Sequence, residues 1–389
     1  MKNLIFMVCL LLFACGEASL FNNSGDIEIN APIDFVQIPG TDIGLVLNSN
    51  VNLTSSIASI AVIDLTSNSI NVDKSVFFPN FASSLAVDEQ RQLILVGDRA
   101  NDVVQVFDYD LGTGGIDQFS LSKRTLNSQL EIKNAVVADE EPSDIQVYTN
   151  ANSDEHAIIS NYIDGTITFL NLDNFTVQDL FPQDDRFGLP LVGLTAFDLD
   201  QTLLGIGAGR IALDPSNNRF AYVASFINNV IFTIDLWDRE IEQTFSLLNY
   251  FSTGGLRDML IDSNQQLYFL HQANDSLNKI DISQVVNNNI LLEESPVQWL
   301  DQVSLPSGAE YMALSPDEQQ LWVGMYDLNQ VWVFDTNTLN KLYEISLDGL
   351  GPAKLVFSED GSFVYVCEFL SSHVAVVDTS SYMQVGMIE

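Results

Sequence analysis

The sequence predicts an all-β chain built from a repeated four-stranded unit, and three observations lead to this prediction. First, the stretch from Arg219 to Leu236 reads RFAYVASFINNVIFTIDL: two runs rich in Val, Ile, Phe and Tyr, divided by a polar break. Second, stretches close to it return along the chain. Third, the runs are short and β-branched, which favours strands over helices. Tight turns of Asn, Asp, Gly and Ser join such runs.

Seven copies of this unit can be aligned by the polar residue near the end of the second run. This residue falls at Asp64, Asp108, Asn171, Asp235, Asp281, Asp335 and Asp378. The shortest intervals between these positions have the length of one four-stranded blade. The predicted fold is therefore a seven-bladed β-propeller of four-stranded antiparallel blades, over residues 31–389, which leaves only short sheet edges exposed.

The fourth copy shows each element of a blade in order. The run RIALD is the innermost strand, PSNN the first turn, FAYVASF the second strand, VIFTIDL the third and EIEQTFSL the fourth. We expect the recurrent Asp to bond backbone N–H groups of the next turn, a structural role rather than a catalytic one. The last copy has its own fourth strand, MQVGMIE. The run DIEIN at residues 26–30 is either a clasp beside it or a tether.

The repeat also resembles a known family. The unit FAYVASFINNVIFTIDL, with lead-ins such as LGPAKLVFSEDGSFVYV, looks like the YVTN repeat of YncE-like and lactonase-like seven-bladed propellers. The resemblance covers nearly the whole chain after its leader. It implies the fold and leaves function open, because this architecture hosts both enzymes and binding proteins.

The N-terminus predicts export and a lipid anchor. MKNLIFMVCLLLFA has a basic start and a short apolar run, so residues 1–14 are predicted to be a signal peptide. Leu12 to Cys15 resembles a bacterial lipobox, which would make Cys15 the lipidated first residue, joined to the propeller by a linker over residues 15–30. Gly16 favours the outer membrane by analogy with bacterial sorting. The alternative is an ordinary signal peptide with an incidental cysteine.

Charge and cysteine content limit the partners. The net charge is −37, spread along the chain, and such a surface repels nucleic acid and anionic lipid. After the leader and the anchor, Cys367 is the one remaining cysteine, so no internal disulfide is expected. Its apolar surroundings in FVYVCEF predict a buried, inert thiol.

Function is expected on the face of the propeller where the innermost strands begin, around the mouth of the central channel. The expected strand starts are Asp34, Ser84, Asp144, Arg210, Asp258, Tyr311 and Lys354, with Arg257 and Glu310 just before two of them. Scarce cations among carboxylates indicate either an anion-binding site or an ion-pair ring that braces the blades.

Two further columns are expected beside the mouth, at the ends of the second strands. One consists of Ser49, Asp98, Asn161, Ser225, Gln272, Met325 and Glu368; the other consists of Asn50, Arg99, Tyr162, Phe226, Ala273, Tyr326 and Phe369. Aromatic rings beside polar groups suit a sugar or a peptide, and equally suit packing between loops. Two long connections, over residues 112–142 and 174–209, are expected to form a ridge over blades two to four or to be tolerated insertions.

Catalysis has little support in the sequence. His271 is placed in the column of Gly97, Ser160, Ala224, Gly324 and Cys367, pointing inward near the mouth. The lactonase resemblance implies a hydrolytic site of Arg, His and Glu, for which Arg210, Arg257, His271 and Glu310 have the right types. Asp34, Asn161 and Glu368 are compatible with a metal, but no diagnostic motif connects either set, so no catalytic residue, metal or cofactor is predicted.

These observations predict a lipid-anchored protein of the bacterial cell envelope, on the periplasmic face or the surface of the outer membrane. Its expected role is non-catalytic binding of an envelope protein, peptide or glycan at the channel mouth. The alternatives are a lactonase-like or metal-dependent hydrolase that uses the same mouth, and an assembly scaffold that uses the outer faces of the blades.

Overall fold

The computed structural model describes residues 28–49, 57–79, 81–113, 115–124, 141–177, 189–190, 207–216, 218–247, 250–251, 254–283 and 298–389. The predicted leader and Cys15 lie outside these residues, so the lipid anchor stays a prediction. No helix in the described ranges has the length and hydropathy needed to span a membrane.

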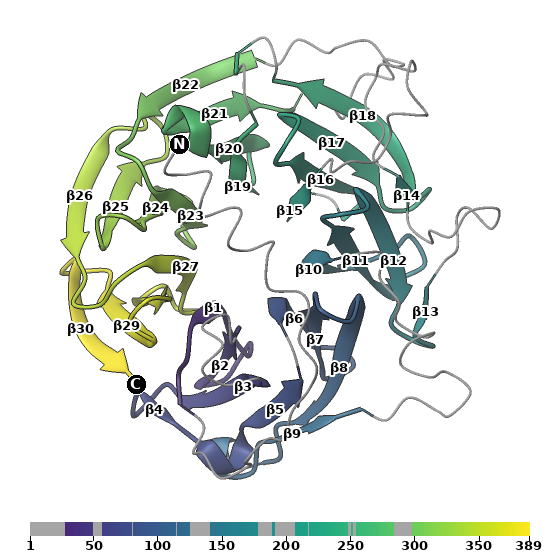
Figure 1. Cartoon of the computed structure of the whole chain (residues 1–389), viewed down its shortest axis with the longest axis vertical. Helices are drawn as coiled ribbons and strands as arrows, with labels where there is room; N and C mark the ends of the chain where they lie inside the picture. The colour runs from purple at the N-terminus through teal and green to yellow at the C-terminus, as the bar shows by residue number, and fades with distance from the viewer. Residues whose placement is uncertain are drawn as a thin grey trace.

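Seven separate sheets stand around a central axis, as Figure 1 shows. The predicted seven-bladed β-propeller of antiparallel blades is therefore confirmed. The innermost strands are β1 (Pro32–Gln37), β6 (Ala82–Asp88), β10 (Pro142–Thr149), β15 (Ala208–Leu213), β19 (Leu256–Ile261), β23 (Ala309–Leu314) and β27 (Pro352–Phe357).

The two middle strands of every blade form the hairpin seen first in the sequence. The second strands are β2 (Ile43–Asn48), β7 (Leu93–Asp98), β11 (Glu155–Asn161), β16 (Phe220–Ser225), β20 (Gln266–His271), β24 (Gln320–Met325) and β28 (Phe363–Glu368). The third strands are β3 (Ile57–Asp64), β8 (Val103–Asp110), β12 (Thr166–Asn171), β17 (Val230–Asp235), β21 (Ser276–Asp281), β25 (Gln330–Asp335) and β29 (His373–Asp378).

The outermost strands divide the ring into a regular and an irregular part. Blades four to seven end in β18 (Glu240–Ser246), β22 (Gln298–Ser304), β26 (Lys341–Ser346) and β30 (Met383–Ile388), each with a bulge at the same place. The first three blades end in shorter pieces: β4 (Ser69–Ile70) with β5 (Val76–Pro79), β9 (Ser120–Lys123), and β13 (Thr176–Val177) with β14 (Leu189–Pro190). The two predicted connections over residues 112–142 and 174–209 therefore contain the strands β9, β13 and β14.

The core consists of apolar layers between neighbouring blades. Between blades four and five, Tyr222 and Ile231 pack against Met259 and Phe269, and all four are buried. A blade buries both of its faces in this way, which explains why the second strands read as unbroken apolar runs without polar alternation. Cys367 lies in the layer between blades seven and one, where burial raises the pKa of its thiol, so the predicted burial of this cysteine is confirmed.

The recurrent Asp of the third strand is a turn residue in six blades. Oδ1 of Asp235 accepts hydrogen bonds from the backbone N–H groups of Trp237 (2.9 Å) and Asp238 (3.1 Å). Equivalent bonds to the next turn are made by Asp64, Asn171, Asp281, Asp335 and Asp378. In blade two the acceptor is Asp110, which bonds Gly112 N–H, instead of the predicted Asp108.

The ring closes without exchange of strands between its ends. Each sheet is formed by one continuous stretch of chain, and β30 completes blade seven as predicted. Residues 28–30 form no strand, so they are not an added clasp strand. Ile29 is nonetheless buried between blades seven and one, against Ile388 and Cys367. Asn48 holds this stretch through Asn30 N–H (3.0 Å) and the Glu28 carbonyl (3.2 Å).

Candidate functional site

A backbone bulge opens every innermost strand at the channel mouth. Its register shifts fall at positions 32/34, 82/85, 142/144, 208/211, 256/258, 309/311 and 352/354. A bulge bends the strand and redirects the side chains within it. The seven predicted strand-start residues, from Asp34 to Lys354, all lie at this bulge.

Three of these carboxylates join one blade to the next. Oδ2 of Asp34 accepts a hydrogen bond from Leu85 N–H in blade two, at 2.9 Å. Asp144 accepts the equivalent bond from Ile211 N–H in blade four (2.9 Å), and Asp258 accepts it from Met312 N–H in blade six. A buried backbone N–H needs a partner, and bonds to a charged acceptor are the stronger ones. These carboxylates therefore brace alternate pairs of blades.

Cations neutralise the same carboxylates. The Arg210 guanidinium lies between Asp258 (Nε to Oδ1, 2.9 Å) and Asp144 (Nη1 to Oδ1, 3.4 Å). Burial alone would lower the pKa of Arg210, but the charges of these two aspartates outweigh it and raise that pKa. Across the closing seam, Lys354 Nζ lies 3.3 Å from Asp34.

A second ion pair lies at the bulges that open the innermost strands of blades five and six. Arg257 pairs with Glu310, whose other carboxylate oxygen accepts a hydrogen bond from the Gln272 side chain at 3.0 Å. The guanidinium groups of Arg257 and Arg210 both lie over the Tyr311 ring, 5.5 and 5.0 Å from its centre. The charged residues of the mouth thus contact one another across neighbouring blades, in the arrangement of an ion-pair brace.

The column at the ends of the second strands differs from the sequence prediction by one residue in two blades. The residues that pair with the first residue of each innermost strand are Asn48, Asp98, Asn161, Ser225, His271, Met325 and Glu368. Asn48 and His271 therefore replace the predicted Ser49 and Gln272. The next column likewise contains Ser49 and Gln272 in place of Asn50 and Ala273, beside Arg99, Tyr162, Phe226, Tyr326 and Phe369.

His271 is consequently not in the column of Gly97 and Cys367, and it does not point to the mouth. Its ring is fully buried and stacked on Phe251, with 3.9 Å between the ring centres. Nε2 lies 3.0 Å from Oδ1 of Asn229, and Nδ1 accepts a hydrogen bond from Asn274 N–H. Both nitrogens are thus engaged by neighbouring loops, as in a structural histidine.

The other polar members of this column are also buried and face the adjoining hairpin. Asn161 donates hydrogen bonds to the hydroxyl groups of Thr166 and Thr168, at 3.0 and 2.9 Å. Asp98 accepts bonds from Asn101 and Gln105. These side chains shape the hairpin and are covered by it, so they do not line an open mouth.

Glu368 stands out within the same column. Its side chain is fully buried, Oε1 accepts a bond from Gly349 N–H at 3.0 Å, and Oε2 has no partner within the described ranges. Burial raises the pKa of Glu368 to about 7, and the charge of Asp348 adds to this effect.

The outer column forms a partly exposed apolar rim around the mouth. Tyr162, Phe226, Tyr326 and Phe369 are half-buried. Their backbone N–H groups bond the carbonyl groups at the start of the same blade's innermost strand, which fixes them at this face. Beyond them the hairpin tips and a blade connection expose larger apolar side chains: Ile227, Leu328, Leu350 and Leu370.

Two cavities lie away from the mouth. One of about 610 Å³ opens at the opposite end of the channel, beside Val87, Val147 and Leu213 of the innermost strands. Another of about 410 Å³ lies over blade five, beside Tyr250 and Trp299, and sequence reasoning missed it. The available signal was Trp299 itself, an aromatic residue in an outer strand whose counterparts in blades six and seven are Lys341 and Gln384.

Metal chemistry has no visible site in this part of the chain. The described residues contain no group of three or more His, Cys, Asp or Glu side chains placed to hold a metal ion. Asp34 lies at the axis, whereas Asn161 and Glu368 lie in the buried hairpin column, so the three residues considered for a metal do not form one site.

Known proteins resemble the chain chiefly in fold. Kuenenia stuttgartiensis hydrazine synthase matches with a TM-score of 0.64 and 13% identity, over 93% of this chain and 99% of that one. The Cps50 (Swd1) β-propeller domain of Myceliophteria thermophila matches with a TM-score of 0.64 and 8% identity, over 92% and 99%. A protein of unknown function from Desulfotomaculum acetoxidans matches with a TM-score of 0.59 and 12% identity, over 85% and 91%.

No curated protein sequence matches the chain. One sequence family does match, described as "Lactonase, 7-bladed beta-propeller", over residues 211–387. The matched residues span blades four to seven, whose outer strands are the regular ones. The chain is thus a seven-bladed β-propeller, and its last four blades are similar to the lactonase-type propeller family.

Proposed function

We propose that this propeller is a non-catalytic binding module of the bacterial cell envelope, and that it engages a peptide or protein through the mouth face. The observation that carries the proposal is the apolar rim. Leu328 and Leu370 are 41% and 52% exposed at neighbouring hairpin tips, next to the half-buried Tyr326 and Phe369. Clustered exposed apolar side chains on one face are typical of interaction sites.

The contacts inside the mouth support binding over hydrolysis. A hydrolase needs a base, an orienting group and an anion-stabilising cation within reach of one reacting atom. Here Arg210 and Arg257 are paired with carboxylates, and His271 is buried between two loops. The family match keeps a lactonase-like activity as the second candidate. It would be supported by lactone hydrolysis that Arg257→Ala abolishes without loss of folding.

The binding proposal is tested with the domain over residues 28–389 immobilised and probed with a detergent extract of the cell envelope. Leu328→Asp and Leu370→Asp should each reduce capture of the retained protein at least about tenfold, because a charge would be buried in an apolar contact. Leu342→Asp is the matched control, since Leu342 is 44% exposed on the outer strand β26. Equal capture by all three variants would contradict binding at the rim, and loss in Leu342→Asp alone would favour the scaffold alternative.

We further infer that Cys15 anchors this module to the membrane, from the lipobox-like sequence of residues 12–15. Membrane-extracted protein should carry the mass of a diacylglycerol-modified Cys15, and Cys15→Ala should move the protein to the soluble fraction. A Cys15→Ala protein that stays in the membrane fraction would disprove the anchor and leave the binding proposal untouched.

A further inference from the structure

The cavity over blade five is formed where two local departures from the blade repeat meet. The first is Trp299 in the outer strand β22, paired with Ile280 of β21. The same position is Ile241 in blade four, Lys341 in blade six and Gln384 in blade seven.

The second departure is the connection that enters blade five. It spans residues 247–255, whereas the next two connections span only 305–308 and 347–351. The longer connection brings Tyr250 and Phe251 to Trp299. Because two separate departures from the repeat contribute to the same cavity, we interpret the cavity as a specific feature of blade five rather than as random variation within the repeat.

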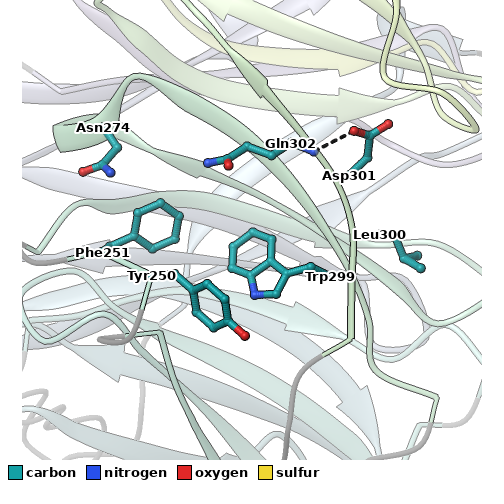
Figure 2. A pocket seen from close by; sticks show the side chains of 7 residues that line it. All are labelled: Tyr250, Phe251, Asn274, Trp299, Leu300, Asp301 and Gln302. Atoms are coloured by element: carbon teal, nitrogen blue, oxygen red, sulfur yellow. Dashed lines mark hydrogen bonds between the residues drawn. The ribbon is translucent and has the colours of Figure 1, made fainter.

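The aromatic part of this cavity is fixed in position on one side and exposed on the other. Trp299 makes edge contacts with the buried rings of Phe251 and Phe269, at 5.9 and 5.8 Å between ring centres. Tyr250 is 52% exposed and tilted over Trp299, at 4.6 Å. Figure 2 shows the rings of Tyr250, Phe251 and Trp299 grouped below Asn274 and Gln302. The result is an ordered aromatic surface that is exposed on one side, and such a surface can stack on a ligand at low entropic cost.

The polar groups of the cavity are neutral or negative. Asn274 and Gln302 have exposed side-chain amides with no hydrogen-bond partner among the described residues. Asp301 is the charged lining residue, and its Oδ1 accepts a bond from Gln302 N–H at 2.8 Å. Nε1 of Trp299 is buried and lacks a partner in the described ranges, and an unpaired buried donor costs about 1–3 kcal/mol.

We propose that this cavity binds a neutral pyranose sugar. Apolar ring faces match the C–H face of a pyranose, and amide and carboxylate groups match its hydroxyl edge. The described lining residues include no cation, and the chain carries a net charge of −37; both facts disfavour a phosphorylated or acidic sugar. The volume of about 410 Å³ lies in the range of small-ligand sites. This site is distinct from the apolar rim of the mouth and does not depend on it.

The test uses the intrinsic fluorescence of the four tryptophans, titrated with maltose, cellobiose and diacetylchitobiose as neutral probes and with galacturonate as the acidic probe. At least one neutral sugar should give a saturable change below about 50 mM. Tyr250→Ala should weaken the affinity for that sugar at least about fivefold, which is the equivalent of one stacking contact. Trp299→Gln, which installs the residue of blade seven, should abolish it.

Trp237→Ala is the matched control, because Trp237 is 45% exposed at a turn of blade four outside the cavity, and it should leave the affinity unchanged. Leu328→Asp should also leave it unchanged, which separates this site from the proposed peptide-binding rim. No saturable response to any neutral sugar, a stronger response to galacturonate, or equal affinity in Tyr250→Ala and the native chain would each overturn the proposal. Thermal unfolding of every variant verifies that its fold is intact.

Discussion

Glu368 brings a carboxyl group into a place where one of its oxygens has no partner among the described residues. Its pKa of about 7 lies well above the ordinary value, so the folded chain keeps a proton that the unfolded chain loses near pH 4.5. The free energy of unfolding should therefore fall as the pH rises from about 4.5 to about 7, because in this window the folded state binds more protons. Above pH 7 the cost of the buried charge is fully present.

Replacing this carboxyl group should remove that cost. At pH 8 we expect Glu368→Gln to raise the free energy of unfolding by about 2 kcal/mol. At pH 5 the difference should fall below about 0.5 kcal/mol, since the native side chain is then protonated. Urea denaturation at the two pH values measures both. Glu344→Gln, on the exposed strand β26, is the control and should leave the pH dependence unchanged; a pH-independent effect of Glu368→Gln would refute this account.

Single residues also show where sequence reasoning reached its limit. The types and the face of the mouth residues could be predicted, because the repeat places them at strand starts and ends. Their partners could not be predicted: that Asp144 binds Arg210 and a backbone N–H of the next blade depends on the bulge. The predicted column is off by one residue at His271, which ends its strand directly before a 3₁₀ turn over Gln272–Asn274, because apolar pattern alone does not locate the last residue of a strand.

Among the elements, the middle hairpins followed from the sequence and the outer strands of the first three blades did not. A second strand is buried on both faces, so its composition alone identifies it. The two-residue strands β4 and β13 have no such composition, because they contribute little buried surface. The Trp299 cavity could not be predicted from the sequence either. Polar and apolar residues alternate along an outer strand, and a single aromatic residue in such a strand resembles ordinary surface.

The turn after each third strand gives a prediction at this scale. The Asp235 carboxylate bonds two backbone N–H groups and, at 2.7 Å, the Nε of Arg219. Asp235→Ala leaves these donors without their acceptor and should lower the free energy of unfolding by about 2 kcal/mol. Asp108→Ala, at the matching position of blade two where Asp110 holds the turn, should cost less than about 1 kcal/mol. Urea denaturation of the two variants compares them, and equal losses would contradict the assigned role.

For the whole molecule, the seam between blades seven and one joins the first and last blades of the chain, which no chain connection links. Gly40 N–H donates to Glu359 at 2.8 Å, and Glu359 N–H donates to the Gln37 side chain at 3.0 Å. Ile29 adds a buried apolar contact from outside both sheets. The sequence indicated the seven units but not this seam, because closure depends on contacts between residues from the two ends of the propeller.

Ile29→Ala should therefore loosen the ring locally. We expect a loss of about 2 kcal/mol in the free energy of unfolding, as for a buried aliphatic truncation. Amide hydrogen exchange should rise first in β1 and β30, the strands that flank the seam. Val385→Ala, 58% exposed on β30, is the control and should change neither quantity. A rise in exchange spread evenly around the ring would show that Ile29 does not act at the seam.

The continuity of each blade along the chain also bears on how the propeller is made. Among the described strands, no sheet needs a strand from a distant part of the sequence, so blade one has all its strands before residue 80 of the chain is synthesised. Pairing within a blade joins neighbouring segments, which keeps loop-closure entropy low and favours assembly in the order of emergence. Only the seam is deferred until the last residues arrive. A circular permutant with its native ends joined and new ends at residues 305–308 would keep every sheet continuous. The final closing contact would then form between blades five and six.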